Sequence, residues 1–478
     1  MSYERRNIFE NVPVLQAIIR LAIPTMIGQI ILVLYNMADT FFIGITGSDA
    51  MLAAVTVCTP AFMFLSAISN LFGVGGASAI ARALGRKDTD CAYDCSAFSF
   101  YGSLMVTAIY SLGVLCFLDN MINLLGGSNP EVHQFARVYM TITVVIGGLS
   151  TSMNALLAHL IRSEGRAMQA SIGIALGGIF NIALDPLFMF VILPKGNELM
   201  GAAIATALSN TLALLYFVFI LVHIRKQSVL RFRWKSQVLS GPIPGEIIRV
   251  GLPACMMTLC ENISFSVMDA LVAVHGLSYQ AGLGVAKKVN MLAHCIVRGI
   301  SQGVLPLIAY NYAAGQKKRM HDVIRSSLII AVGMASLCTA ISLFGARELI
   351  SIFIHNASDS LDHGITYLRI LCIGCPFSAL AYILISVFQA VNFGGESLVL
   401  ALLRKGILDI PLLFVLNRAL PPYGLAWATP GADFICAICA ITLYELFKKQ
   451  INRGTAVSLT DRIHDMAILK AFTRAQVR

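Results

Sequence analysis

Charged residues are scarce in this sequence. They make up 13% of its 478 residues, while 57% are hydrophobic, and a soluble globular domain carries roughly a quarter charged residues. Ordinary soluble domains do not have this composition. The net charge of +10 does not indicate nucleic-acid binding, because lysine and arginine stand in short segments between apolar runs and form no continuous basic face or arm.

Signatures of enzymes and metal sites are also missing. The sequence has no nucleophile elbow, phosphate loop or HExxH motif, and its histidines stand singly. The 12 cysteines lie mostly inside apolar stretches, without the clustering of a disulfide scaffold. Two CxxC pairs, Cys372 with Cys375 and Cys436 with Cys439, lack the further ligands that structural zinc needs. We expect no cofactor and no tightly bound metal, and an intramembrane enzyme is a disfavoured alternative.

Long apolar runs dominate the chain, and a membrane-spanning helix needs about 20 apolar residues. Six runs lie near 14–43, 50–81, 96–118, 135–158, 168–193 and 200–224. Six more lie near 247–275, 283–312, 322–345, 364–390, 397–417 and 424–447. The first run has no cleavage-site pattern, so we interpret it as an uncleaved helix. We predict an all-α integral membrane protein of about twelve transmembrane helices.

Basic residues alternate between the predicted loops and therefore predict the orientation. One set of loops holds Arg5, Arg6, Arg82, Arg86, Lys87, Arg162, Arg166, Arg225, Lys226, Arg231, Arg233, Lys235, Lys317, Lys318, Arg319, Lys448 and Lys449. The opposite set holds little beyond Lys195, Arg347 and Arg418. By the positive-inside rule, both termini are expected to be cytoplasmic in a protein of the plasma membrane.

The two halves of the chain repeat each other. Ala22-Ile23-Pro24 recurs as Gly251-Leu252-Pro253, and Asp185-Pro186-Leu187 has a counterpart in Asp409-Ile410-Pro411-Leu412, at offsets between 223 and 230 residues. Six spans per half give both repeats the same orientation, as in transporters whose lobes face each other across a cleft. The predicted parts are an N-terminal lobe 1–224, a cytoplasmic linker 225–246, a C-terminal lobe 247–447 and a cytoplasmic tail 448–478.

Acidic residues within membrane helices are candidates for function, because a charge there costs about 2.5 to 3.5 kcal/mol. In the first helix, Asp39 follows Tyr35 by four residues, and Asn181 and Asp185 repeat this spacing in the fifth helix, so each pair shares a face. An aspartate at headgroup level and a structural hydrogen bond stay open as alternatives. Pro24 predicts a bend in the first helix, either fixed or moving.

The second half offers fewer clear candidates. They are Glu261 and Asp269 in the seventh helix and Asp409 in the eleventh. Arg404 or Lys405 stands one turn before Asp409 and could form an ordinary ion pair with it. Arg298 in the eighth helix is a further possible partner for an acid.

Several motifs together resemble the multidrug and toxic compound extrusion family over nearly the whole chain. They are Ile23-Pro24 followed by Tyr35-Asn36-Met37-Ala38-Asp39-Thr40-Phe41-Phe42-Ile43-Gly44, then Arg162-Ser163-Glu164-Gly165, Asn181 to Asp185 with Pro186, and Leu305-Pro306-Leu307-Ile308-Ala309-Tyr310-Asn311-Tyr312. The resemblance implies twelve helices in two lobes and antiport of mostly cationic amphipathic compounds against protons or sodium ions.

The resemblance also implies which residues couple ion movement to export. Prokaryotic members place a cation-coupling network in the N-terminal lobe, and the matching residues here are Asp39, Tyr35, Asn181 and Asp185, with Tyr139, Asn154 and Thr206 as further members. Some members instead use a glutamate eight residues after the proline of the seventh helix, the place of Glu261. Those members also use an acid in the tenth helix, and this sequence has none between Gly364 and Asn392.

The expected mechanism is competition for a carboxylate. A carboxylate in a poorly hydrated cavity is costly to leave bare, so a coupling cation or a cationic substrate must neutralise it. A flippase for lipid-linked precursors is the alternative among transporters, but such proteins have fourteen helices and a cationic cavity, whereas we expect twelve and an acidic one. The expected partners are small cationic or amphipathic molecules and the lipid bilayer, with the protein acting as a monomer.

Overall fold

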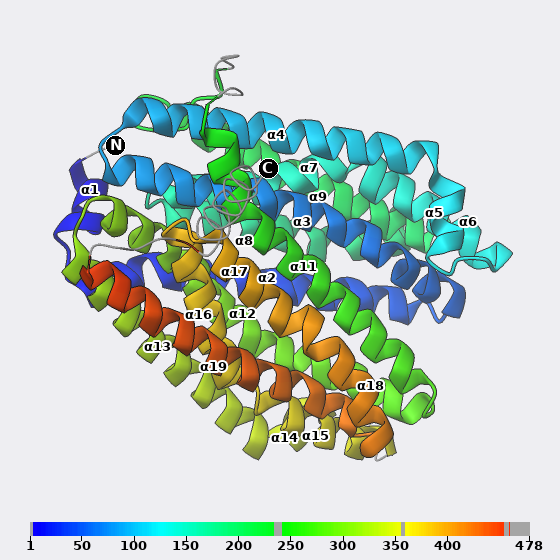
Figure 1. Ribbon diagram of the computed structural model, residues 1–478. Helices are drawn as coiled ribbons and strands as arrows, with labels where there is room; N and C mark the ends of the chain where they lie inside the picture. Colours follow the sequence, from blue (N-terminus) through cyan, green and yellow to red (C-terminus); the bar gives the residue numbers. More distant parts are fainter. Residues whose placement is uncertain (1–2, 234–240, 355–358, 454–457, 459–478) are drawn as a thin grey trace, which may run out of the picture.

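The computed structural model describes residues 3–233, 241–354, 359–453 and 458, and the regular structure in them is helical throughout (Figure 1). Residues 234–240 of the predicted linker lie outside the described residues. Residues 454–457 and 459–478 of the predicted tail lie outside them as well.

The first half begins with a short helix and continues with six spans. Two of the spans contain a π-helical turn, and a short helix precedes the fourth span. The elements are α1 (Tyr3–Glu10), α2 (Val14–Ile45), α3 (Asp49–Gly85), α4 (Thr89–Cys116), α5 (Leu118–Leu124), α6 (Pro130–Met140), η1 (Thr141–Ile146), α7 (Gly148–Ser163), α8 (Ala167–Pro186), η2 (Leu187–Ile192) and α9 (Glu198–Ile224).

The second half has the same order of spans. Its fourth span is again a bent pair of helices, and its fifth again contains a π-helical turn. The elements are α11 (Ile243–Ala273), α12 (Leu277–Ala313), α13 (Lys317–Phe344), α14 (Ala346–Ser351), α15 (Asp359–Cys372), α16 (Cys375–Ala390), α17 (Gly394–Leu402), η3 (Leu403–Ile407), α18 (Asp409–Ala419) and α19 (Gly424–Arg453).

The predicted spans correspond to these helices. Within the described residues, nine helical stretches are long and apolar enough to cross a membrane, and two pairs bent by 47° and 43° bring the number to eleven. The remaining predicted span, the eleventh along the chain, corresponds to α17, η3 and α18, whose apolar sequence is interrupted by Arg404, Lys405 and Asp409. The all-α membrane fold is therefore confirmed.

Local sequence explains where several helices begin and end. The side chains of Ser48 and Asp88 accept hydrogen bonds from the backbone amides of Met51 and Cys91, which caps α3 and α4 at their first turns. The fourth span of each half is followed by a residue of positive φ, Gly165 at 79° and Asn392 at 67°. These two residues are 227 positions apart, so the repeat extends to the turn that follows each fourth span.

The helices of the two halves form two groups that meet along α2, α3, α11 and α12. In the contact between the groups, α11 packs along α3 and α12 packs along α2. Figure 1 shows the groups close together near α1 and the last turns of α19 and separated at the other end, between α5 and α6 on one side and α14, α15 and α18 on the other.

Glycines let the two groups approach closely where they meet. A Cβ atom on Gly251 of α11 would lie 1.7 Å from the Leu71 carbonyl oxygen of α3. A Cβ atom on Gly303 of α12 would lie 2.8 Å from the Ala22 Cα atom of α2. Gly251 and Ala22 are equivalent in the repeat, so the two contacts are related by the same pseudo-symmetry. Side chains larger than hydrogen would separate the helices at these points.

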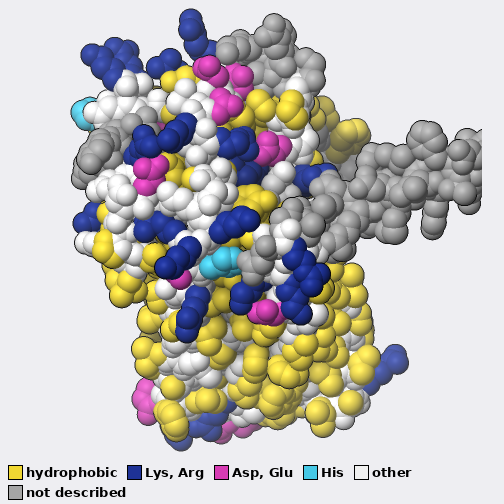
Figure 2. All heavy atoms as spheres, turned by 60° about the vertical axis from the view of Figure 1, so that its left-hand side comes forward, with side chains coloured by type: hydrophobic (Ala, Val, Ile, Leu, Met, Phe, Trp, Pro, Cys, Tyr) yellow, Lys and Arg dark blue, Asp and Glu magenta, His cyan; other side chains and the backbone are white. Residues whose placement is uncertain are grey.

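Basic side chains are concentrated at the end of the molecule where the two groups of helices meet. Figure 2 shows lysine and arginine side chains gathered over one end of the molecule, with a broad hydrophobic surface beside them. At this end the exposed Arg86 and Lys87 follow α3, and the exposed Lys317 and Lys318 begin α13, so we call it the basic end. The opposite end, called the far end, carries the exposed connection with Lys195. Arg82, Arg162 and Arg166 were expected in loops at the basic end, but their side chains are buried between helices.

Candidate functional site

Five of the seven residues expected in the N-terminal coupling network lie together. Asn181 of α8 donates from Nδ2 to Asp185 Oδ1 at 3.2 Å and to Thr206 Oγ1 of α9 at 3.3 Å. Asp185 is completely buried and Asn181 is 1% exposed. Asp39 and Tyr35 of α2 interact electrostatically with Asp185. We call these five residues the N-site.

A glycine allows α2 and α8 to form this site. A Cβ atom on Gly178 would lie 2.9 Å from Ile31 Cγ2 and 3.3 Å from Tyr35 Cδ1, so a larger residue would push the helices apart. The buried Tyr139, at the end of α6, also interacts electrostatically with Asp39 and Asp185. Asn154 of α7 instead donates to Asn210 Oδ1 at 3.2 Å, and no hydrogen bond joins it to the N-site within the described residues.

The N-site contains acceptor oxygens without donors. Asp39 Oδ1, Asp185 Oδ2 and Asn181 Oδ1 are buried, and none has a hydrogen-bond partner among the described residues. Buried polar atoms in proteins are nearly always paired, because an unpaired one loses its hydration without compensation. Two carboxyl groups and one amide oxygen are hard oxygen ligands that suit a proton or a small cation. Lys288 of α12 interacts electrostatically with Asp39, but no ion pair joins a lysine or arginine to either carboxyl group among the described residues. The arrangement can therefore bind a further positive charge.

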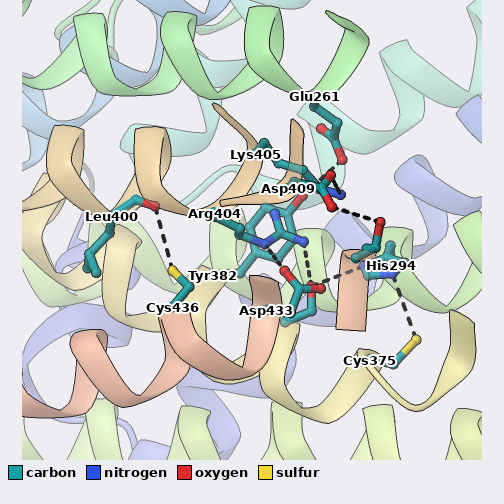
Figure 3. Close-up of polar contacts among 12 residues, drawn as sticks. Glu261, His294, Cys375, Tyr382, Leu400, Arg404, Lys405, Asp409, Asp433 and Cys436 are labelled. Carbon is teal, nitrogen blue, oxygen red and sulfur yellow. Dashed lines mark hydrogen bonds and ion pairs between the residues drawn. The ribbon is translucent and has the colours of Figure 1, made fainter. Parts of the chain in front are cut away.

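The equivalent place in the second half already contains a cation. The repeat relates Asp185 to Asp409 and Asn181 to Lys405, both at an offset of 224 residues. Lys405 Nζ lies 3.0 Å from Asp409 Oδ2 (Figure 3). Thr429, the counterpart of Thr206, donates to Asp409 Oδ1 at 3.1 Å. Asp409 thus pairs with Lys405, which is one of the two partners expected for it. Arg404, the other, pairs elsewhere.

The two acids of the seventh helix are paired as well. Glu261 of α11 lies 2.7 Å from Arg298 Nη2 of α12, so Arg298 is the partner for an acid that the sequence suggested. Asp269 Oδ1 lies 2.5 Å from Lys287 Nζ, and the Asp269 side chain is 52% exposed. Its exposure makes Asp269 a weak candidate for a buried ion site, because water competes for an exposed carboxylate.

A third buried acid lies in this region, and the sequence patterns did not single it out. Asp433 of α19 is completely buried, and its Oδ1 atom lies 2.7 Å from Arg404 Nε of η3 (Figure 3). Arg404 also donates from Nη2 to Ser378 Oγ of α16 at 2.6 Å. The available signal was the aspartate itself, which stands within the twelfth apolar run.

The cavity between α2 and the C-terminal helices is lined mainly by basic side chains, whereas an acidic cleft was expected. Its wall includes Gln29, Leu32, Val33 and Asn36 of α2 and, from the second half, Glu261, Phe265, Met268, Lys287, Asn290, Met291, His294, Cys295, Arg298, Leu371, Arg404, Lys405 and Thr429. One carboxylate and four lysine or arginine side chains therefore line it. The expectation was wrong because the acids Asp409 and Asp433 stand behind their basic partners and do not line the wall.

A family model described as MatE matches residues 24–187 and 253–415, which together make up more than half of the chain. The chain belongs to the MatE family. The resemblance seen in the sequence is thereby confirmed, and the matched stretches fall one in each half of the repeat. Membership in this family of transporters excludes the alternative of an intramembrane enzyme.

Curated relatives and solved structures are similar along nearly the whole chain. A multidrug export protein MepA from Staphylococcus saprophyticus is 28% identical over 454 residues, covering 95% of this chain and 98% of the relative. A MepA from Staphylococcus haemolyticus is 29% identical over 460 residues, with 95% and 98% covered. An outward-facing multidrug resistance MATE family transporter has a TM-score of 0.87 at 23% identity, with 95% of this chain and 100% of that chain covered, which shows a shared fold.

Proposed function

We propose that this MatE family member is a secondary antiporter that exports amphipathic compounds carrying a cationic group in exchange for protons or sodium ions. Multidrug export is supported by family membership and by the relatives named as multidrug export proteins. The coupling ion, its site and the charge of the substrate are the proposal. The observation that carries the proposal is the N-site, where buried acceptor oxygens have no donor among the described residues.

The N-site is proposed to couple ion movement to export, because its carboxylate charge must be neutralised by a bound cation. Two carboxyl groups in one poorly hydrated site do not both ionise cheaply, so a proton or a sodium ion is held there when substrate is absent. A cationic substrate neutralises the same carboxylates and competes with the ion. Because the ion and the substrate cannot occupy the site together, entry of the ion down its gradient drives the substrate out.

The proposal assigns coupling to one lobe. Lys405 supplies to Asp409 the positive charge that Asp185 lacks, and Arg298 does the same for Glu261. A tethered ammonium or guanidinium group does not leave its site and so does not move charge across a membrane. The possible C-terminal site formed by Glu261, Asp269 and Asp409 is therefore proposed to be structural with respect to coupling.

Access to the N-site follows from how the two groups of helices meet. We infer that the basic end is cytoplasmic by the positive-inside rule, so the groups are closed toward the cytoplasm and separated toward the outside. Arg82 of α3 bridges the closure, with Nη2 2.7 Å from Glu246 Oε1 and Nη1 3.1 Å from the Ala390 carbonyl oxygen. Pro24 lies between Ala22 and Met26, which contact Gly303 and Gly299 of α12, so a moving bend there would act directly on the closure.

We propose that the protein acts as a monomer, because both lobes needed for alternating access come from one chain. Both of its termini are proposed to be cytoplasmic.

The decisive test is flux in vesicles that contain the purified protein and an entrapped cationic dye. An imposed proton gradient or an imposed sodium gradient should drive the dye, and the variants Asp39→Asn and Asp185→Asn should lose this response. Asp119→Asn is the matched control, because Asp119 is 53% exposed and lies on α5. Dye movement that ignores both gradients would overturn the proposal.

A further inference from the structure

Two thiols are in contact at the beginning of α4. Cys91 Sγ lies 3.9 Å from Cys95 Sγ, and this is the only hydrogen bond between two thiols among the described residues, which include all 12 cysteines. Cys95 is completely buried, whereas Cys91 is partly exposed. The pair lies in the first two turns of α4, at the basic end. A reagent in the solvent therefore reaches Cys91 and meets a second thiol beside it.

The surroundings of Cys91 favour its thiolate. Arg86 Nη2 donates to Cys91 Sγ at 3.8 Å, and the backbone amide of Cys91 donates to Asp88 Oδ1 at 3.0 Å, which caps the helix at this point. Cationic groups and helix N-termini stabilise the thiolate, which is the nucleophilic and ligating form of cysteine. Cys91 is therefore the reactive member of the pair, and Cys95 stands in place as a second ligand.

Helical spacing disfavours a disulfide between these two thiols. Residues four positions apart on a helix have Cβ atoms about 5 to 6 Å apart, whereas a disulfide needs Cβ atoms about 3.5 to 4.5 Å apart. A disulfide would therefore distort the first turns of α4. A single atom bonded to both sulfurs spans the longer distance without this distortion.

The geometry selects among atoms that bond two thiolates. Among the described residues, no group of three or more histidine, cysteine, aspartate or glutamate side chains is placed to hold a metal ion, so a zinc site with four protein ligands does not form there. A soft ion in linear coordination, with bonds of about 2.3 Å, would hold the sulfurs about 4.6 Å apart. The observed 3.9 Å fits a centre with bent bonds better. Trivalent arsenic with one organic substituent is such a centre, and it has two positions for thiolates.

We propose that Cys91 and Cys95 form a dithiol site that binds trivalent arsenic compounds with one organic substituent. In the hydrated compound R–As(OH)2, each thiol gives its proton to one hydroxyl group. Two As–S bonds form, two As–O bonds break and two water molecules leave. Arsenic stays trivalent, so the step needs no oxidant and no reductant. The site is separate from the N-site and from the cavity, whose wall contains neither cysteine.

The dithiol adjoins the bridge that closes the basic end. Cys95 interacts electrostatically with Arg82 and Glu246, the two residues of that bridge. The next residue, Ser96, accepts a hydrogen bond at 3.1 Å from the backbone amide of Arg231 in the predicted linker. Opening of the basic end requires this bridge to break and re-form. An organic substituent held beside the bridge should therefore slow export.

Retention of phenylarsine oxide by the purified full-length protein in detergent tests the site. Excess mercaptoethanol removes arsenic from single thiols, such as the exposed Cys116 at the other end of α4. It should not remove arsenic from a chelating pair, because the second bond holds the atom while the first re-forms. Measurement of the intact mass should then show one phenylarsenic group per chain, and dithiothreitol, which chelates as well, should remove it.

Serine variants locate the retained arsenic. In Cys91→Ser and in Cys95→Ser, the mercaptoethanol concentration that removes half of the arsenic should fall at least about a hundredfold, the size expected from loss of a tethered second contact. Cys91 is partly exposed, so Cys91→Ser keeps the test independent of any packing defect in Cys95→Ser. The matched control Cys436→Ser/Cys439→Ser removes two cysteines from α19 and should retain the group.

No retained arsenic in the unsubstituted protein, or equal retention in Cys91→Ser, would overturn the site. In vesicles, the bound arsenical should remove most of the gradient-driven dye flux, dithiothreitol should restore it, and Cys91→Ser should be insensitive. Retention with unchanged flux would confirm the dithiol and overturn its link to the closure. Dye flux that ignores both gradients would overturn the proposed function, and retention in detergent tests the dithiol even then.

Discussion

Lys405 occupies in the second half of the chain the position that Asn181 occupies in the first, and each stands four residues before a buried aspartate. Asn181 gives Asp185 a hydrogen bond, whereas Lys405 gives Asp409 a full positive charge at 3.0 Å. On the proposed mechanism, this difference makes the first site dependent on an external cation and the second independent of one.

Replacement of this lysine should therefore turn the second site into a copy of the first. In Lys405→Asn, Asp409 remains buried with hydrogen bonds from Ser264 and Thr429 but without a cation. The folded state should then take up a proton or a sodium ion, so its stability falls as pH rises and recovers when sodium is added. Thermal unfolding in detergent across pH measures this. The control Lys405→Asn/Asp409→Asn should show neither response, and a single variant that matches its control would contradict the idea.

The acid of the seventh helix should matter less for coupling than the acid of the first. Glu261 is neutralised by Arg298, whereas Asp39 Oδ1 has no donor among the described residues. We expect Glu261→Gln to keep most gradient-driven flux of a cationic dye and Asp39→Asn to abolish it, at matched expression. An equal or larger loss in Glu261→Gln would move the coupling site to the C-terminal half.

The contact between Arg82 and Glu246 should hold the basic end closed. Arg82 is 2% exposed, so loss of the Glu246 carboxylate would leave a buried guanidinium with weaker partners. Breaking a fully buried ion pair costs roughly 3 to 5 kcal/mol, and the cost is less here because Glu246 is partly exposed. Spin labels at Lys87 and Lys317, one on each group of helices, should report longer distances in Glu246→Gln. Unchanged distances would mean that the glycine contacts alone keep the end closed.

The orientation is tested by labelling single cysteines in a cysteine-free background. Asn197 lies in an exposed connection at the far end, so a cysteine there should react with a membrane-impermeant reagent in intact cells. Ser236, which belongs to the predicted linker and lies outside the described residues, should react only after the membrane is permeabilised. External labelling at Ser236 would reverse the assignment of the cytoplasmic side.

Structural features that depend on neighbours in sequence could be predicted, and features that depend on contacts between distant helices could not. Apolar runs of about 20 residues are local, so twelve spans were visible. The i, i+4 spacing likewise anticipated that Asn181 would contact Asp185 and that Lys405 could pair with Asp409.

The ion pair between Arg404 and Asp433 joins residues 29 positions apart on η3 and α19, and no sequence spacing specifies it. The bridge from Arg82 to Glu246 spans 164 positions and connects the two halves. The sign of the cavity wall depends on which member of each pair faces the cavity, and this is set by packing. For that reason an acidic cavity was expected where the wall is mainly basic.

The central claim is that Asp39 and Asp185 act as one cation site, and the most direct measurement compares gradient-driven flux in Asp39→Asn, Asp185→Asn and the double variant. Residues that act as a unit are not additive, so each single variant should abolish ion-driven export and the double variant should be little worse than either. Membrane insertion should persist, because an amide is cheaper to bury than a charge. Losses that add in free energy, or full transport in either single variant, would contradict the shared site.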